Sequence, residues 1–171
     1  ADVPYVGCGV LASAVGMDKE ISKRLAKEAG IPVLPHVMAE HSDKSSKWLK
    51  SCVRLGFPLF VKPARLGSSV GVFKVTTADK LVRAVRSALR YDTKIMIEKG
   101  IDRAREIVCA VLGTDIRADA SVCGEVSIKG RHEFFDYSSK YTDPDGFALI
   151  IPADISLALG ARVRNLSVRA F

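Results

Sequence analysis

Hydrophobic residues recur at helical spacing in the stretch of chain that follows Asp18. Ile21, Leu25 and Ala29 fall on one face, with charged residues between them. The Asp18 carboxylate can cap the first turn, and Gly30 is a typical residue at which a helix ends. The pattern therefore predicts an amphipathic helix between these two positions.

Two more helices are predicted in the first half of the chain. One covers residues 45–55 and ends at Gly56. The other carries an apolar stripe over residues 81–89 at the spacing of an amphipathic helix. Thr76, with Asp79 three residues later, resembles a capping box, so we expect Thr76 to cap this helix.

Strands are predicted where short apolar runs lie between turn-forming residues. These runs are residues 59–61, 72–75, 95–97 and 107–112. Beyond them we expect short strands and turns over 121–135, a polar loop over 136–146, a strand over 148–151 and a helix from 155. That helix has no stop signal before the last residue and the chain has no initiator Met, so we interpret the sequence as a fragment.

Composition and charge narrow the possible functions. The chain has 171 residues, 48% hydrophobic and 26% charged, which fits one globular domain or two small ones. We see no apolar run long enough for a membrane span and no secretory signal. The net charge of +7 comes from basic residues spread along the chain, and aromatic residues are few, so we expect no nucleic-acid partner.

The cysteines lie at positions 8, 52, 109 and 123, and no two form a C-x-x-C pair. The three histidines add no zinc-binding spacing. Because most neighbours of the cysteines are apolar, we expect buried thiols in a reducing compartment rather than disulfides.

The strongest chemical signal is a lysine followed by a glycine- and serine-rich turn. Lys62 ends a predicted strand, and Gly67, Ser68, Ser69 and Gly71 follow closely. Glycines let a backbone approach a polyphosphate, N–H groups and hydroxyls bond its oxygens, and a lysine adds positive charge. The alternative is an ordinary flexible hairpin with an exposed lysine.

A second signal follows the predicted strand at residues 95–97. Glu98, Lys99 and Ile101 form a short hinge whose backbone groups can face an adenine edge, and Glu106 can accept hydrogen bonds from ribose hydroxyls. The alternative is a connection that carries solvated charges.

Two further lysines are candidates for binding an anion. Lys140, with Tyr141, stands at the tip of a polar loop that could close over a site and exclude water. Lys19 lies in the first turn of a predicted helix, where a cation opposes the helix dipole unless an anion is near. The alternatives are an exposed loop and a surface lysine.

In their order and spacing, several motifs resemble those of D-alanine–D-alanine ligases. They are residues 5–14, 17–19, 62–71, 109–113, 135–141 and 151–154. The resemblance implies an α+β fold of the ATP-grasp type. It also implies three parts: residues 1–17 end an N-terminal substrate domain, 18–105 form the central ATP-grasp subdomain, and 106–171 begin the C-terminal lobe.

The resemblance implies a reaction that joins two D-alanines for peptidoglycan precursors. ATP phosphorylates the carboxylate of one D-alanine, and the amine of the second attacks the acyl phosphate. The partners are thus D-alanine and ATP, with Mg²⁺ or Mn²⁺ in the full-length enzyme. The family is usually dimeric and cytoplasmic, and we carry this over as an expectation.

The resemblance also assigns roles to single residues. Lys140 matches the loop lysine that reaches the transferred phosphoryl group, and Tyr141 the tyrosine that pairs with Ser68 near the substrates. The residues that match the ATP contacts are Lys19, Lys62, Gly67, Ser68 and Ser69 for the phosphates, Glu98, Lys99 and Ile101 for adenine, and Glu106 for ribose.

The chain departs from the family pattern in three ways. Residues 102–106 hold one residue more than the usual turn and lack its glycine, and Phe135 stands where many members have Tyr. The glycine-rich N-terminal domain and the Arg-x-Asp and Asn-Glu-x-Asn magnesium motifs are not in the sequence. The carboxylates after Lys140 show no metal-ligand arrangement. We therefore expect no metal ligands in this chain and no activity from it alone.

Three alternatives remain open. One is a ligase that makes D-alanyl-D-serine or D-alanyl-D-lactate, although Tyr141 argues against the lactate type. Another is a different ATP-grasp enzyme, such as a carboxylase or a glutathione-type ligase, against which the residue 135–141 loop argues. The last is a non-catalytic nucleotide-binding or interaction module.

Overall fold

The computed structural model describes residues 3, 5–114, 116–130, 134 and 136–171, apart from the side chains of Ser46 and Ser138. The chain divides into two compact units. Unit 1 contains residues 1–25 and 33–100, and unit 2 contains residues 26–32 and 101–171. The predicted three-part division stays a prediction.

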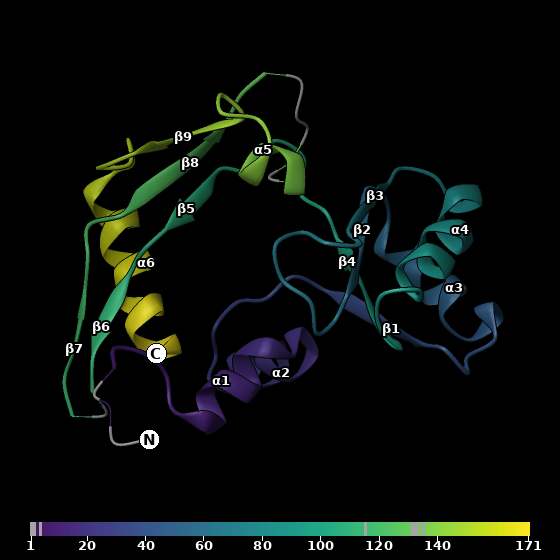
Figure 1. Cartoon of the computed structure of the whole chain (residues 1–171), viewed down its shortest axis with the longest axis horizontal. Coiled ribbons are helices and arrows are strands. Elements are labelled where there is room, and N and C mark those ends of the chain that lie inside the picture. Colours follow the sequence, from purple (N-terminus) through teal and green to yellow (C-terminus); the bar gives the residue numbers. More distant parts are fainter. Residues whose placement is uncertain (1–2, 4, 115, 131–133, 135) are drawn as a thin grey trace. The chain divides into compact units, whose positions relative to one another are not determined.

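Unit 1 is built on an antiparallel sheet with the strand order β1-β4-β2-β3. In Figure 1, helices α3 and α4 lie along one face of this sheet. The elements up to residue 100 are α1 (Val10–Met17), α2 (Lys19–Glu28), β1 (His36–Glu40), α3 (Ser45–Leu55), β2 (Leu59–Pro63), β3 (Phe73–Val75), α4 (Ala78–Ala88) and β4 (Lys94–Lys99).

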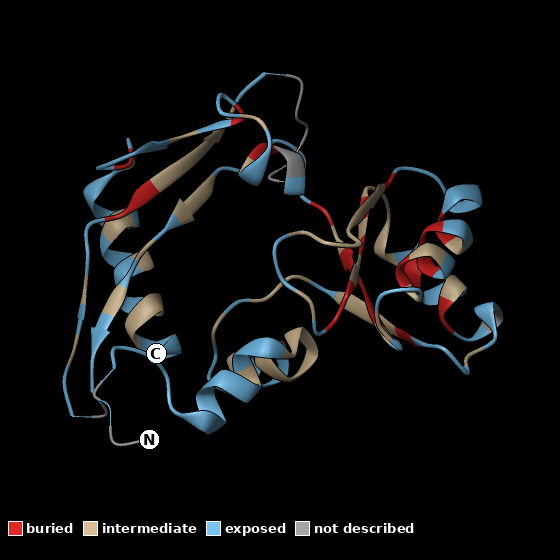
Figure 2. Ribbon diagram, viewed as in Figure 1, coloured by how far each residue is buried: buried red, intermediate tan, exposed pale blue. Residues whose placement is uncertain are grey.

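The alternation of side chains along β2 and β4 gives the sheet of unit 1 two different faces. Leu59 and Ile97 point to the face that α3 and α4 cover, where Trp48 and Leu81 complete a closed apolar core. Figure 2 shows this core as the main concentration of buried residues in the unit. Glu98 points to the opposite face, which carries charged side chains as well.

The helices predicted before residue 100 are confirmed as α2, α3 and α4, and most of their first and last residues agree with the prediction. The Asp18 carboxylate caps α2 and accepts from the backbone N–H groups of Glu20 at 3.0 Å and Ile21 at 3.2 Å. The predicted cap at Thr76 is wrong, because the helix begins one residue later with Thr77 as its N-cap. Helix α1 and strand β1 were not predicted.

The sheets of unit 2 have fewer strands than the sheet of unit 1. A three-stranded antiparallel sheet has the order β5-β8-β9, and β6 pairs with β7 separately. Side chains that are buried here include Cys123, Ser139 and Ala153, whereas α6 has no buried residue. The elements are β5 (Glu106–Val108), β6 (Val111–Gly113), β7 (Ala118–Ala120), β8 (Gly124–Ile128), α5 (Tyr137–Tyr141), β9 (Phe147–Ile150) and α6 (Leu157–Ala170).

Two predictions in unit 2 are corrected. The single strand expected over residues 107–112 is two strands, because the chain leaves β8 after Val108 and pairs with β7 from Val111. The loop expected over residues 136–146 contains the short helix α5. The final helix and the strand before it are confirmed, with Ser156 as the N-cap of α6.

The four cysteines are free thiols, but they are not all buried as expected. Cys52 and Cys123 are buried, Cys109 is half-buried and Cys8 is exposed. No helix in the described part of the chain is both long enough and apolar enough to cross a membrane.

Candidate functional site

A buried carboxylate held by two lysines lies on the face of the unit 1 sheet opposite to α3 and α4. The strand register places Phe60 opposite Glu98, and Lys62 follows two residues later on the same side. Lys62 Nζ lies 2.6 Å from one oxygen of Glu98, and Lys23 pairs with the other oxygen. Burial alone would raise the pKa of Glu98, but the two lysines outweigh it and hold this pKa below its usual value.

Lys19 is a third cation at this site. Its ammonium donates to the backbone oxygens of Ala64, at 3.4 Å, and Leu66. Burial and the nearby positive charge of Lys62 lower the pKa of Lys19. Because two lysines share one carboxylate and the Lys19 ammonium is bound to carbonyl oxygens, this site favours an added anion.

Ion pairs connect the start of helix α2 to strand β4. Lys94 Nζ lies 2.9 Å from the carboxylate of Asp18 and 2.5 Å from that of Glu20. Asp18 is also the cap of α2, so one carboxylate both begins the helix and fixes it to the sheet. This arrangement holds Lys19 and Lys23, which lie in the same helix, at their positions.

The turn after Lys62 has an unusual backbone. Ser68 and Ser69 have φ angles of +52° and +59°, in the left-handed region that residues other than glycine rarely adopt. The N–H of Val70 donates to the oxygen of Gly67 at 3.1 Å and closes the turn. Such strain persists only where the surroundings impose it, and it is common at ligand-binding turns.

Both ends of this turn are anchored. Before it, Arg65 pairs with the carboxylate of Asp92, which also accepts from the Arg65 N–H at 2.9 Å. After it, Gly71 has a φ of +69°, and a Cβ at this position would lie 2.9 Å from both Pro63 and the ring of Tyr91. A side chain at position 71 would therefore displace the turn from the sheet.

The predicted adenine hinge begins where β4 ends. The Lys99 ammonium donates to the backbone oxygen of Phe57 at 2.8 Å. The backbone N–H of Lys99 donates to the oxygen of Pro35 at 3.0 Å. The N–H of Gly100 donates to the oxygen of Pro58 at 2.8 Å. These hinge donors are already used within unit 1, so a ligand at the hinge needs other groups, such as the N–H of Ile101.

In unit 2, Glu106 is the first residue of β5. The guanidinium of its neighbour Arg105 binds both oxygens of Glu125, at 2.8 and 2.6 Å, and donates to the oxygen of Asp154 at 2.8 Å. The nearby turn lacks the family's glycine, and Arg103 there has a φ of +53°. Arg103 thus takes the conformation that a glycine would adopt without strain.

Helix α5 carries Lys140 and Tyr141. Ser139 is fully buried, its N–H donates to the Asp136 carboxylate at 2.7 Å, and its hydroxyl donates to the Asp136 oxygen at 3.0 Å. A Cβ at Gly146 would lie 2.7 Å from the Ser139 oxygen, so only glycine permits this close approach. Lys140 is half-buried and Tyr141 is 61% exposed.

Part of the predicted site comes together in unit 1, namely Lys19, Lys62, Glu98 and the turn at residues 67–69. Lys99 also lies in unit 1, at the end of β4. Unit 2 contains the remaining predicted residues, and Phe135 lies outside the described residues. The residues of unit 2 are Ile101, Glu106, Lys140 and Tyr141. Sequence reasoning missed Lys23, although its position one helical turn after Lys19 was a possible signal.

Within the described ranges, no group of three or more His, Cys, Asp or Glu side chains could hold a metal ion. We therefore assign no metal ligand to the part of the chain that the structure describes.

Comparisons with known proteins point to one family. A family model described as the D-ala D-ala ligase C-terminus matches residues 25–171. D-alanine–D-alanine ligase A of Bradyrhizobium diazoefficiens is 48% identical over 175 residues, covering 100% of this chain and 46% of that protein. Ligase A of Escherichia coli is 41% identical, with the same two coverages. The chain thus spans about half the length of the curated relatives it matches.

Solved structures agree with this result. The VanG D-Ala:D-Ser ligase from Enterococcus faecalis is similar with a TM-score of 0.83 and 33% identity, covering 98% of this chain and 48% of that one. D-alanyl-alanine synthetase A from Vibrio cholerae has a TM-score of 0.83 and 28% identity, covering 99% and 51%. The predicted ATP-grasp fold is confirmed by these neighbours.

Proposed function

Because the chain belongs to the D-alanine–D-alanine ligase family, we propose that it supplies the ATP-binding part of an enzyme that joins two D-alanines. One observation carries the proposal for unit 1. Lys23 and Lys62 pair with the buried Glu98 carboxylate, and Lys19 lies near Lys62, beside a turn whose serines have left-handed backbones. An ATP polyphosphate has the charge and the acceptor oxygens that such a site can bind.

In the proposed reaction, a carboxylate oxygen of one D-alanine attacks the terminal phosphorus of ATP, so that an acyl phosphate forms and ADP leaves. The amine of the second D-alanine then attacks the acyl carbon, and phosphate leaves. Phosphoryl transfer depends mainly on positioning and on neutralising charge. Lys62 and Lys19 do this for the phosphates, while Glu98 holds Lys62 and Lys23 in place before ATP binds.

The other ATP contacts are proposed from the family resemblance. Gly67, Ser68 and Ser69 cover the phosphates with backbone N–H groups and hydroxyls. Lys99 and Ile101, with Glu98, face the adenine, and Glu106 accepts from the ribose. The strained backbone at positions 68 and 69 supports the first of these roles.

The residues of α5 are proposed to act on the reacting end of ATP. Lys140 reaches the transferred phosphoryl group, and Tyr141 pairs with Ser68 near the D-alanines. The buried Ser139 supports this role, because it anchors the helix from which these two side chains project. Mg²⁺ or Mn²⁺ is expected with ATP, but none of these roles depends on a metal ligand from the described residues.

A second candidate is a ligase that makes D-alanyl-D-serine. The likeness to the VanG D-Ala:D-Ser ligase favours it. A competition assay that offers D-alanine, D-serine and D-lactate to the whole protein separates the two. Preference for D-alanine as the second substrate supports the main proposal, and preference for D-serine replaces it.

The main proposal also includes that the whole protein is a cytoplasmic homodimer.

The direct test of the reaction measures D-alanyl-D-alanine and phosphate from the whole protein that carries this chain. We expect both products only when ATP and D-alanine are present together. Lys140→Met should lower the rate of product formation at least tenfold, whereas Lys129→Met, at another position of unit 2, should not. ATP binding without any dipeptide from D-alanine or D-serine would leave the non-catalytic nucleotide-binding module as the better account.

A further inference from the structure

Two cysteines meet where the strands of unit 2 change partners. Val108 lies opposite Gly124, and Val111 lies opposite Ala120. Between these pairs, residues 109–110 on one side face residues 121–123 on the other. The extra residue is a β-bulge.

The hydrogen bonds of the bulge show which residues face each other. The N–H of Ser121 donates to the oxygen of Ala110 at 2.9 Å, and the N–H of Ala110 donates to the Ser121 hydroxyl at 3.1 Å. Ala110 is therefore paired with Ser121, which leaves Cys109 facing Val122 and Cys123. Residues that face each other in this way have Cα atoms about 4.5–5.5 Å apart, within the range that a disulfide spans.

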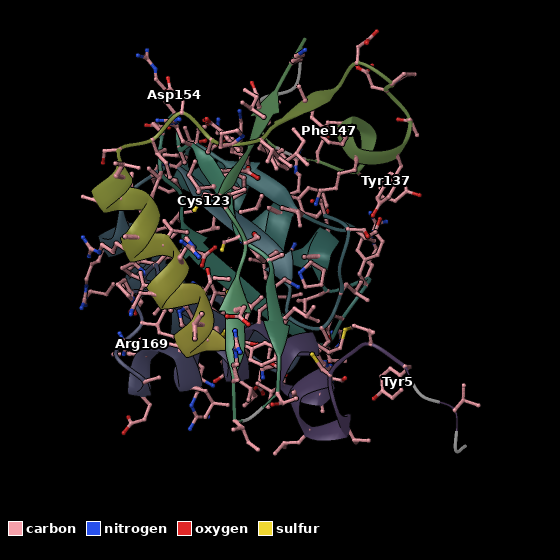
Figure 3. The ribbon with its side chains drawn as sticks, turned by 90° about the vertical axis from the view of Figure 1, so that its left-hand side faces the viewer. Tyr5, Cys123, Tyr137, Phe147, Asp154 and Arg169 are labelled. Carbon is pink, nitrogen blue, oxygen red and sulfur yellow. The ribbon has the colours of Figure 1, made fainter. Side chains whose placement is uncertain are left out.

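The two thiols also lie near each other. Burial, and then the neighbouring Cys109 thiol, raise the pKa of Cys123. Cys109 Sγ also lies 3.5 Å from the oxygen of Ser121, and Cys123 Sγ lies 3.8 Å from that of Gly160 in α6. Figure 3 labels Cys123 next to this helix.

We propose that Cys109 and Cys123 form a reversible cross-strand disulfide when the chain meets a small-molecule disulfide such as oxidised glutathione. The Cys109 thiolate attacks one glutathione sulfur, forms a mixed disulfide and releases one glutathione thiolate. The Cys123 thiolate then attacks the Cys109 sulfur and releases the second. Two cysteine thiols lose two electrons and two protons, and the oxidised glutathione becomes two reduced molecules.

The surroundings of the thiols set the order of these steps. Cys109 is half-buried and can meet the oxidant, whereas Cys123 is only 6% exposed and reacts with the neighbour it already contacts. Cys52 lies in the core of unit 1, where burial raises its pKa to about 11, so this thiol stays unreactive. Cys8 is exposed and serves as the comparison for a simple surface thiol.

The test uses the chain in buffers with increasing ratios of oxidised to reduced glutathione, followed by alkylation of the remaining thiols and digestion with trypsin. Trypsin cuts after Arg105, Arg117 and Lys129, so the two cysteines fall in separate peptides, 106–117 and 118–129. We expect these peptides to appear linked, about 2 Da lighter than their sum. Dithiothreitol should separate them.

Variants distinguish this disulfide from general thiol oxidation. The linked peptides should form in Cys8→Ser and Cys52→Ser as in the wild type, and be lost in Cys109→Ser and Cys123→Ser. In Cys123→Ser, Cys109 should instead retain one glutathione. A wild-type chain in which Cys109 keeps its glutathione, or in which only Cys8 reacts, would overturn the proposal. These readouts need no ATP or D-alanine, so they are independent of the proposed ligase activity.

Discussion

The two units of the chain differ in how they hold their charged groups. In unit 1 the Glu98 side chain is 9% exposed, and its partners Lys23 and Lys62 are 19% and 20% exposed. In unit 2 Glu125 has a good bidentate partner, but Arg105 is 51% exposed. An ion pair near water contributes little, whereas a sheltered one depends strongly on its partner.

The two units differ in the same way in their apolar packing, which is more buried in unit 1. Unit 1 closes a core between its sheet and helices α3 and α4, which is coloured as buried in Figure 2. In unit 2, β9 and α6 contain large apolar residues that are exposed, such as Leu149 and Leu157. A buried polar network whose members are all paired makes its surroundings more rigid. The contrast therefore favours unit 1 as the unit that holds its site residues preformed.

The largest predicted effect concerns the core. Leu81 is fully buried, and Leu81→Ala should lower the free energy of unfolding of unit 1 by about 3 kcal/mol, because it removes packed atoms and leaves a cavity. Urea titration that follows the fluorescence of Trp48, the single tryptophan, measures this loss. Leu149→Ala in unit 2, where the leucine is 52% exposed, should change stability far less. Equal losses would remove the contrast between the units.

Removal of the buried carboxylate should have the next largest effect. Glu98→Gln leaves Lys23 and Lys62 without a counter-charge and should cost about 2 kcal/mol of unfolding free energy, less than a fully buried pair because both lysines can turn toward water. The same Trp48 titration applies. Glu40→Gln is the matched control, since it makes the same change at an exposed carboxylate of the same sheet and should have little effect.

Acid should reduce the difference in unfolding free energy between the wild type and Glu98→Gln. The two lysines lower the pKa of Glu98 below its usual 4.5, although burial opposes them. Its contribution to stability is therefore complete above pH 4.5 and is lost as the pH falls through the lowered pKa. The stability gap between the wild type and Glu98→Gln should be constant near neutral pH and should shrink in acid. A gap that grows in acid would contradict the assigned ion pairs.

The smallest effect is a gain in stability in unit 2. Arg103 adopts a left-handed backbone, so Arg103→Gly should stabilise the chain by up to about 1 kcal/mol. Arg103→Ala keeps the backbone strain and should give no gain. Thermal unfolding followed by circular dichroism compares the two variants. If both variants gain equally, the arginine side chain rather than its backbone is the cause.

The fold could be predicted where a single face of an element is buried. Helices α3 and α4 pack against the sheet of unit 1, and their apolar spacing revealed them. Helix α1 was missed because it buries no residue, so selection for a core leaves no periodic pattern there. The break at Cys109 was missed because a bulge depends on the partner strand and not on the local run of apolar residues.

The site could be predicted only where its chemistry is local. Lys62 and the turn after it stand in one short stretch, so their glycines and serines were visible together. Lys23 was missed because the carboxylate that gives it a role lies far along the chain, in β4. The left-handed backbones of Ser68 and Ser69 also gave no signal, since serine does not mark that conformation as glycine does.

The central claim is that the lysines around Glu98 bind the phosphates of ATP. Calorimetric titration of the chain with ATP tests it most directly, with circular dichroism to check that each variant is folded. We predict that Lys62→Met weakens ATP binding at least tenfold, because it removes a charge-assisted bond and leaves Glu98 with one lysine fewer. Lys47→Met, the same change at an exposed lysine of unit 1, should leave the affinity within about twofold. Equal ATP affinity of the wild type and Lys62→Met would contradict the account.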